Sequence, residues 1–123
     1  MAFLTDRKRA VGMGSAKSGT EHHWSMKKSS VALLILIPFF VFTFGSALGG
    51  TYEEVIEYYS HPFPAIIAAL TLAVGFKHFN DGAQVMIEDY VHGTAEKYAI
   101  IAVTVLSYGL AATGIFAIAR LAI

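Results

Sequence analysis

The chain has 123 residues, of which 55% are hydrophobic and 15% are charged, and its mean hydropathy is +0.56. This composition is too apolar for a soluble domain of this size, so it predicts a membrane protein. Nine Lys+Arg balance nine Asp+Glu, so no charge excess indicates nucleic acid as a partner. The 123 residues contain no cysteine, which excludes disulfides and cysteine-ligated zinc or iron–sulfur centres within them.

Residues 1–28 form a basic segment that precedes the first apolar run. The run lacks a small-residue cleavage site, so we expect no cleaved signal peptide. Residues 10–20 are rich in Gly and Ser, which predicts a mobile approach to the membrane. Six of the nine Lys+Arg lie in this segment, namely Arg7, Lys8, Arg9, Lys17, Lys27 and Lys28.

The remaining chain, 29–123, is predicted to be a membrane anchor of three spanning helices. They cover about residues 29–50, 62–90 and 97–121, and each has the ~20 residues that a ~30 Å hydrocarbon layer requires. Pro38 lies inside the first and should kink it. The segment between the first two helices is expected to be an interfacial loop. The predicted fold class is therefore all-α, a three-transmembrane-helix bundle.

The distribution of basic residues predicts how the bundle is oriented. Most of them precede the first span, Lys97 follows the second span, and the loop after the first span contains none. The positive-inside rule then places the N-terminus in the cytoplasm, on the same side as the 88–97 loop.

The second predicted helix carries ionisable groups in the stretch GFKHFNDGAQVMIEDYVHG, residues 75–93. The eleven steps from His78 to Asp89 turn a helix by ~1100°, about 20° from three full turns, so both share one face about 16 Å apart. Gly82 lies on the same stripe and leaves space for a flat ligand. An ionisable group inside a span is a functional candidate, although His78 can also be a structural histidine bonded to a neighbouring helix. Lys77 and Asp81, four residues apart, predict a structural ion pair.

The pattern His78, Gly82, Asp89 and Tyr90, read as H-x3-G-x6-D-Y on the second of three spans, resembles the small cytochrome b anchor of succinate dehydrogenase, its D-type hydrophobic subunit. The resemblance covers nearly the whole chain. It implies that His78 is one axial ligand of a b haem, with the second ligand on the larger cytochrome b anchor subunit. It also implies that Tyr90 and Asp89 border a ubiquinone pocket. Succinate chemistry would occur on another subunit, so we expect no catalytic residue in this chain.

The N-terminal flank EHHWSMKKSSVAL departs from that family, which usually has an Arg followed two places later by Thr or Ser near the haem propionates. Two lysines stand in for the arginine. A lysine neutralises a propionate but lacks the bidentate fork of arginine, and both lysines can equally snorkel at the membrane boundary. The candidates for the haem-propionate or quinone pocket are His22, His23, Lys27, Lys28 and Ser29, with Ser30 as the partner of Lys28 in the alternative register.

The leading interpretation is the hydrophobic membrane anchor of succinate dehydrogenase. Such an anchor holds the flavoprotein and iron–sulfur subunits at the membrane and helps to form the b-haem and ubiquinone sites. Electrons then pass from succinate to ubiquinone in the tricarboxylic acid cycle and respiratory chain. The alternatives are a fumarate reductase anchor, a haem-free proton-conducting or transport subunit with a relay through Lys77, His78 and Asp81, and a purely structural scaffold. We expect a multi-pass protein of the bacterial inner membrane, in contact with lipid, rather than of the mitochondrial inner membrane.

Overall fold

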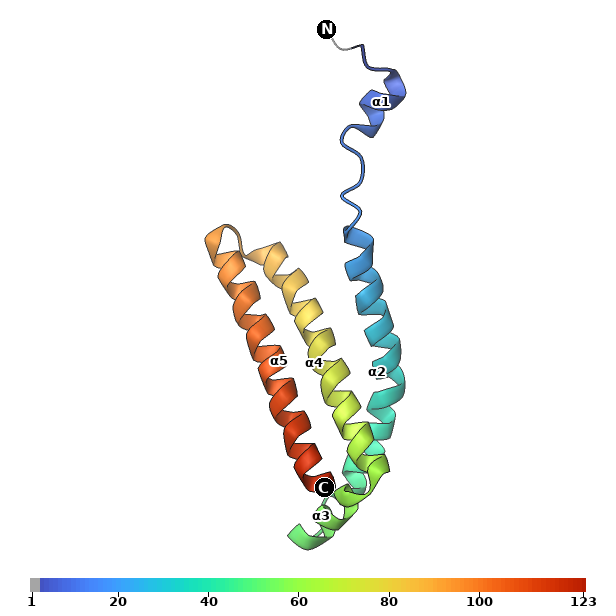
Figure 1. Cartoon of the computed structure of the whole chain (residues 1–123), viewed down its shortest axis with the longest axis vertical. Helices are drawn as coiled ribbons and strands as arrows, with labels where there is room; N and C mark the ends of the chain where they lie inside the picture. The colour runs from blue at the N-terminus through green and yellow to red at the C-terminus, as the bar shows by residue number, and fades with distance from the viewer. Residues whose placement is uncertain (1–2) are drawn as a thin grey trace.

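The computed structural model describes residues 3–123 as helices joined by short connections, with no strand in that range (Figure 1). Three of the helices have 29 residues each and are apolar enough to cross a membrane. The all-α class and the three spanning helices are therefore confirmed. The helices are α1 (Asp6–Val11), α2 (Gly19–Ala47), α3 (Tyr52–Ser60), α4 (Pro62–Tyr90) and α5 (Thr94–Ala122).

The first spanning helix, α2, begins at Gly19, ten residues before the expected start at residue 29. Its length of about 43 Å, at ~1.5 Å per residue, exceeds the ~30 Å hydrocarbon layer. The expectation was wrong because hydropathy marks where a helix enters the hydrocarbon, whereas backbone hydrogen bonds continue into the polar boundary. Pro38 lies inside α2 and does not end it.

The expected interfacial loop is partly helical. Thr51 caps α3 with a capping box, in which its Oγ1 accepts from the Glu54 backbone N–H at 3.3 Å and Glu54 Oε2 accepts from the Thr51 N–H at 2.7 Å. Tyr59 is buried and packs edge-on against Tyr58 with ring centroids 5.3 Å apart. This burial raises the pKa of the Tyr59 hydroxyl, and the neighbouring Tyr58 adds to the effect. The T-x-x-E signature of the cap was present in the sequence.

The second spanning helix, α4, runs over the expected range, from Pro62 to Tyr90. Proline is favoured in the first turn because its missing N–H has no helical partner there. After α4 the chain reverses within three residues, and Gly93 adopts a φ of 74°, which residues with a Cβ rarely adopt. α5 then packs closely on α4, since a Cβ at Gly114 would lie 2.8 Å from Leu72 Cδ1.

The central helix of the bundle is α4, which packs against α2 on one side and α5 on the other (Figure 1). α2 and α4 are antiparallel, so the N-terminal half of α2 lies beside the C-terminal half of α4. Among residues 3–123 the buried hydrophobic residues are few and mostly small, namely Tyr59, Ala65, Ala68, Ile87 and Ala111. The large apolar side chains of α2 and α5 face outward, as expected for helices in lipid or against partner helices.

Candidate functional site

The central feature of the site is a contact between His78 of α4 and Ser29 of α2. The distance from Ser29 Oγ to His78 Nδ1 is 2.8 Å. Ser29 is only 6% exposed, and its hydroxyl also lies 2.9 Å from the carbonyl oxygen of Met26, one turn earlier in α2. The imidazole is therefore held by its Nδ1 edge from the neighbouring helix.

The second ring nitrogen of His78, Nε2, is the atom that would have to bind a metal, because Nδ1 contacts Ser29. Within the described chain, His78 Nε2 forms no hydrogen bond, so it could bind a metal in the tautomer that carries its hydrogen on Nδ1. Gly82 lies one turn further along the same face, and a Cβ there would have Met26 Cε, at 3.9 Å, as its nearest neighbour. Residues 3–123 contain no cluster of three His, Asp or Glu side chains that could hold a metal ion. A b haem held by two histidines takes one from each side of the ring, so a single histidine here could supply one of them.

A second polar cluster lies beside this contact. Lys77 Nζ is 2.6 Å from Asp81 Oδ2 and 2.6 Å from Ser25 Oγ, and the Ser25 hydroxyl lies 3.4 Å from the same carboxylate oxygen. The side chain of Asp81 is 12% exposed and that of Lys77 is 44% exposed. The predicted i,i+4 ion pair between Lys77 and Asp81 is confirmed, and it also links α4 to α2.

Four further polar side chains lie along α4 and α5. Gln84 Nε2 donates to Thr104 Oγ1 at 3.3 Å. One turn away on each antiparallel helix, Asn80 and Ser107 are buried, and neither Asn80 Oδ1 nor Ser107 Oγ has a hydrogen-bond partner in the described chain. This set of polar side chains was not predicted from the sequence. The spacing of polar residues along one helix shows neither which helix packs against it nor in what register.

Asp89 and Tyr90 close the C-terminal end of α4. Both are exposed, Tyr90 by 81%, and the helix ends with the Val91 N–H donating to the Ile87 carbonyl at 2.7 Å. Asp89 shares a face with His78 at an axial separation of about 16 Å, so the chain alone does not bring the two together. The phenol and the carboxylate are therefore accessible at this end of the bundle.

The N-terminal candidates lie on the first half of α2 and separate into two groups. Ser29 contacts His78, a contact that the sequence did not predict. His22 is half-buried, whereas His23, Lys27 and Lys28 are exposed. Both lysines, with Trp24, Ser30 and Val31, line an open cavity of about 540 Å³, and Lys27 Nζ lies 5.8 Å from the centre of the Trp24 ring.

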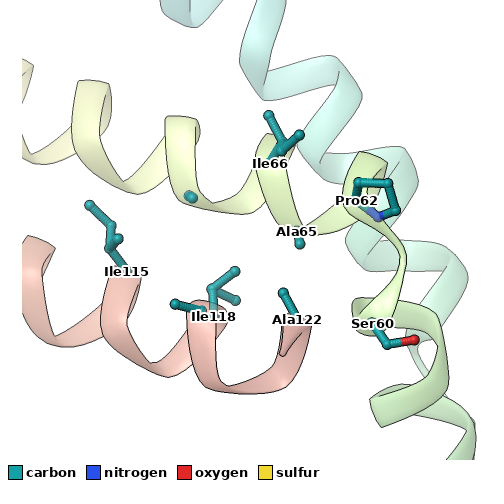
Figure 2. Close-up of a pocket in the computed structure, with 9 residues that line it drawn as sticks. Ser60, Pro62, Ala65, Ile66, Ile115, Ile118 and Ala122 are labelled. Carbon is teal, nitrogen blue, oxygen red and sulfur yellow. The ribbon is translucent and has the colours of Figure 1, made fainter.

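Another cavity, of about 310 Å³, lies between the far ends of α4 and α5 (Figure 2). Ile115 and Ile118 point from α5 toward α4 around it. Ser60 provides the one side-chain hydroxyl of the lining, and it already donates to the Glu57 carbonyl at 2.6 Å. Because the cavity offers no free side-chain donor and lies about 20 Å along α4 from His78, it is not part of the polar site.

The fold and the site define a class of protein: a polytopic membrane protein with three spanning helices, whose central helix presents one half-buried histidine. Residues 2–115 match the family model described as succinate dehydrogenase/fumarate reductase transmembrane subunit. The chain belongs to this family. No solved structure gives a significant match.

Three relatives carry the name succinate dehydrogenase hydrophobic membrane anchor subunit. The protein of Paracoccus denitrificans is 42% identical over 98% of this chain and 94% of its own length. That of Archaeoglobus fulgidus is 37% identical over 82% of this chain and 90% of its own length. That of Rickettsia bellii is 29% identical over 72% of this chain and 71% of its own length. Together with the three apolar helices, these relatives support a multi-pass protein of the bacterial inner membrane.

Proposed function

We propose that this chain is the hydrophobic membrane-anchor subunit of a succinate dehydrogenase, a non-catalytic subunit of an oxidoreductase complex. The observation that carries this function is the 42% identity to a subunit of that name over 98% of the chain, which includes all three spans and the polar face of α4. An anchor of this kind associates with the flavoprotein and iron–sulfur subunits. The family also includes fumarate reductase subunits, which use the same redox couple in the opposite direction.

In this proposal His78 is one axial ligand of a b haem, and the second ligand comes from the larger cytochrome b anchor subunit. The free Nε2 edge and the uncrowded stripe at Gly82 support the assignment. When bound, the haem supplies a one-electron redox centre within the membrane. Lys27, Lys28, His22 and His23 lie at the polar entry of α2 and are the candidates to neutralise its propionates.

The quinone site in this proposal lies at the C-terminal end of α4. The Tyr90 hydroxyl donates a hydrogen bond to a carbonyl oxygen of ubiquinone, and this bond strengthens as the oxygen gains negative charge. The Asp89 carboxylate holds a proton or a basic group at the pocket entrance. Both side chains are exposed in this chain, so the rest of the pocket is contributed by the larger anchor and the iron–sulfur subunit. Basic residues around the start of α2 and at Lys97 support a cytoplasmic location for this end.

A haem-free proton relay is the weaker alternative. A relay needs polar groups that can exchange partners along a path. The Lys77 ammonium is already bound to Asp81 and Ser25 at 2.6 Å, and the imidazole is bound to Ser29. These contacts join α2 to α4, and within residues 3–123 no side-chain hydrogen bond links the group of Lys77, Asp81 and Ser25 to the Ser29–His78 contact.

The decisive experiment is purification of the complex through an affinity tag on this chain from its native membrane in mild detergent. We expect covalent or tightly bound flavin, iron–sulfur clusters and low-spin b haem to copurify, together with succinate-to-quinone activity. A haem spectrum also separates an electron-transfer anchor from a transport subunit. Recovery of the chain without the flavoprotein and iron–sulfur subunits, under conditions that preserve succinate–quinone activity in the membrane, would contradict the anchor function.

A further inference from the structure

We propose that Ser29 is the positioning residue of His78: its hydroxyl accepts a hydrogen bond from Nδ1–H, which selects the imidazole tautomer whose Nε2 can bind haem iron. The inference rests on the haem ligation proposed above. It adds a residue of α2 that positions the proposed ligand on α4. The two atoms lie 2.8 Å apart, within the usual range for a hydrogen bond.

Counting hydrogens favours one direction of this bond. A serine hydroxyl has one hydrogen, and Ser29 Oγ lies 2.9 Å from the Met26 carbonyl oxygen, which can only accept. When the hydroxyl donates to that carbonyl, the contact with the imidazole requires a hydrogen on Nδ1. A neutral imidazole carries one N–H, so Nε2 is then the unprotonated nitrogen. The opposite direction would leave the hydrogen on Nε2 and block iron.

The surroundings of Ser29 make this bond effective. The residue is 6% exposed, so water does not compete with the imidazole for the hydroxyl. The neighbouring contact of Ser25 with Lys77 fixes α2 against α4 one turn away and thus maintains the register in which Ser29 meets His78. Together these contacts hold Nδ1 of the imidazole toward Ser29.

The bond also affects the redox behaviour of the site. Donation from Nδ1–H makes the imidazole a stronger electron donor at Nε2, which favours oxidised over reduced iron. Loss of the acceptor should therefore raise the haem midpoint potential. It should also weaken haem retention by roughly 10- to 100-fold, the usual effect of removing such a partner.

The experiment compares Ser29→Ala, Ser29→Thr and Thr43→Val in the intact complex purified through this chain. Thr43 is the matched control, because it is also a buried hydroxyl of α2 but bonds only to carbonyls of its own helix, Phe39 at 2.9 Å and Phe40 at 3.2 Å. The readouts are haem per flavin, the haem midpoint potential and the low-spin electron paramagnetic resonance signal of the oxidised haem.

We expect Ser29→Ala to raise the haem midpoint potential, shift the resonance signal and lower haem per flavin. Ser29→Thr should return all three readouts toward the parent values. Thr43→Val should leave them unchanged. A parent-like potential and resonance signal in Ser29→Ala would overturn the inference. If Ser29→Ala empties the site, haem retained in Ser29→Thr supports the inference, and haem lost from both assembled variants overturns it. Haem ligation itself is tested separately by His78→Ala, since haem that persists there removes the proposed ligand and not only its positioning residue.

Discussion

Lys77 Nζ and Asp81 Oδ2 lie 2.6 Å apart one turn along α4, within a membrane span, and Ser25 Oγ of α2 contacts the same ammonium at 2.6 Å. In a span, a charge without a partner is costly, whereas a neutralised pair is tolerated. The pair therefore neutralises its own charges and, through Ser25, attaches the polar half of α2 to the central helix.

We predict that breaking the Lys77–Asp81 pair on one side destabilises the complex more than removing both charges. Lys77→Met leaves an unpaired carboxylate, and Asp81→Leu leaves an unpaired ammonium. Removing one partner of a fully buried ion pair lowers the free energy of unfolding by up to about 3–5 kcal/mol. The 44% exposure of Lys77 reduces this value. The measurement is thermal unfolding of the purified complex for both singles and the double variant. Additive losses in the double variant would show that the two groups act independently.

His78→Ala is expected to abolish the low-spin b-haem spectrum, because His78 is the only histidine within α4. The control is His61→Ala, which removes an exposed histidine at the opposite end of α4. Pyridine haemochrome and reduced-minus-oxidised spectra of purified complexes provide the measurement. Haem retained at parent occupancy in His78→Ala, with two histidine ligands from elsewhere, would assign the ligand to another position.

Ser107→Ala should leave the stability of the complex unchanged or increase it. The Ser107 hydroxyl is 1% exposed and has no partner in the described chain, and an unsatisfied buried group of this kind costs about 1–3 kcal/mol. Thr104→Val should instead lower stability by about 1 kcal/mol, because Gln84 loses its acceptor. Thermal unfolding of the two variants distinguishes them. A large loss from Ser107→Ala would reveal a partner for this hydroxyl in the assembled complex.

Interactions between residues close together in the chain could be predicted from the sequence, whereas those between distant residues could not. The i,i+4 ion pair of Lys77 and Asp81 and the limits of α4 were predicted because helix geometry and the proline at position 62 are local signals. The start of α2 was placed too late because hydropathy reports the surroundings of a helix and not its backbone bonds. The contact of Ser29 with His78 joins residues 49 positions apart. It depends on how two antiparallel helices are registered, which no local pattern in a single sequence encodes.

Tyr90→Phe tests the quinone end of α4, because it keeps the ring and removes only the hydroxyl donor. If that donor stabilises the reduced quinone, succinate-to-quinone turnover should fall about 10- to 100-fold, the loss expected for one well-placed hydrogen bond worth about 1.4–2.8 kcal/mol. Asp89→Asn should show the same selective loss.

The control for these two variants is the oxidation of succinate with an artificial acceptor that takes electrons from the soluble subunits, which should stay near the parent rate. Tyr52→Phe is the matched variant, since it removes an exposed tyrosine hydroxyl on α3, at the other end of the bundle. Equal losses in both assays would indicate failed assembly. Unchanged quinone turnover in Tyr90→Phe and Asp89→Asn would remove these residues from the site, because neither side chain has another partner in the described chain that could mask its loss.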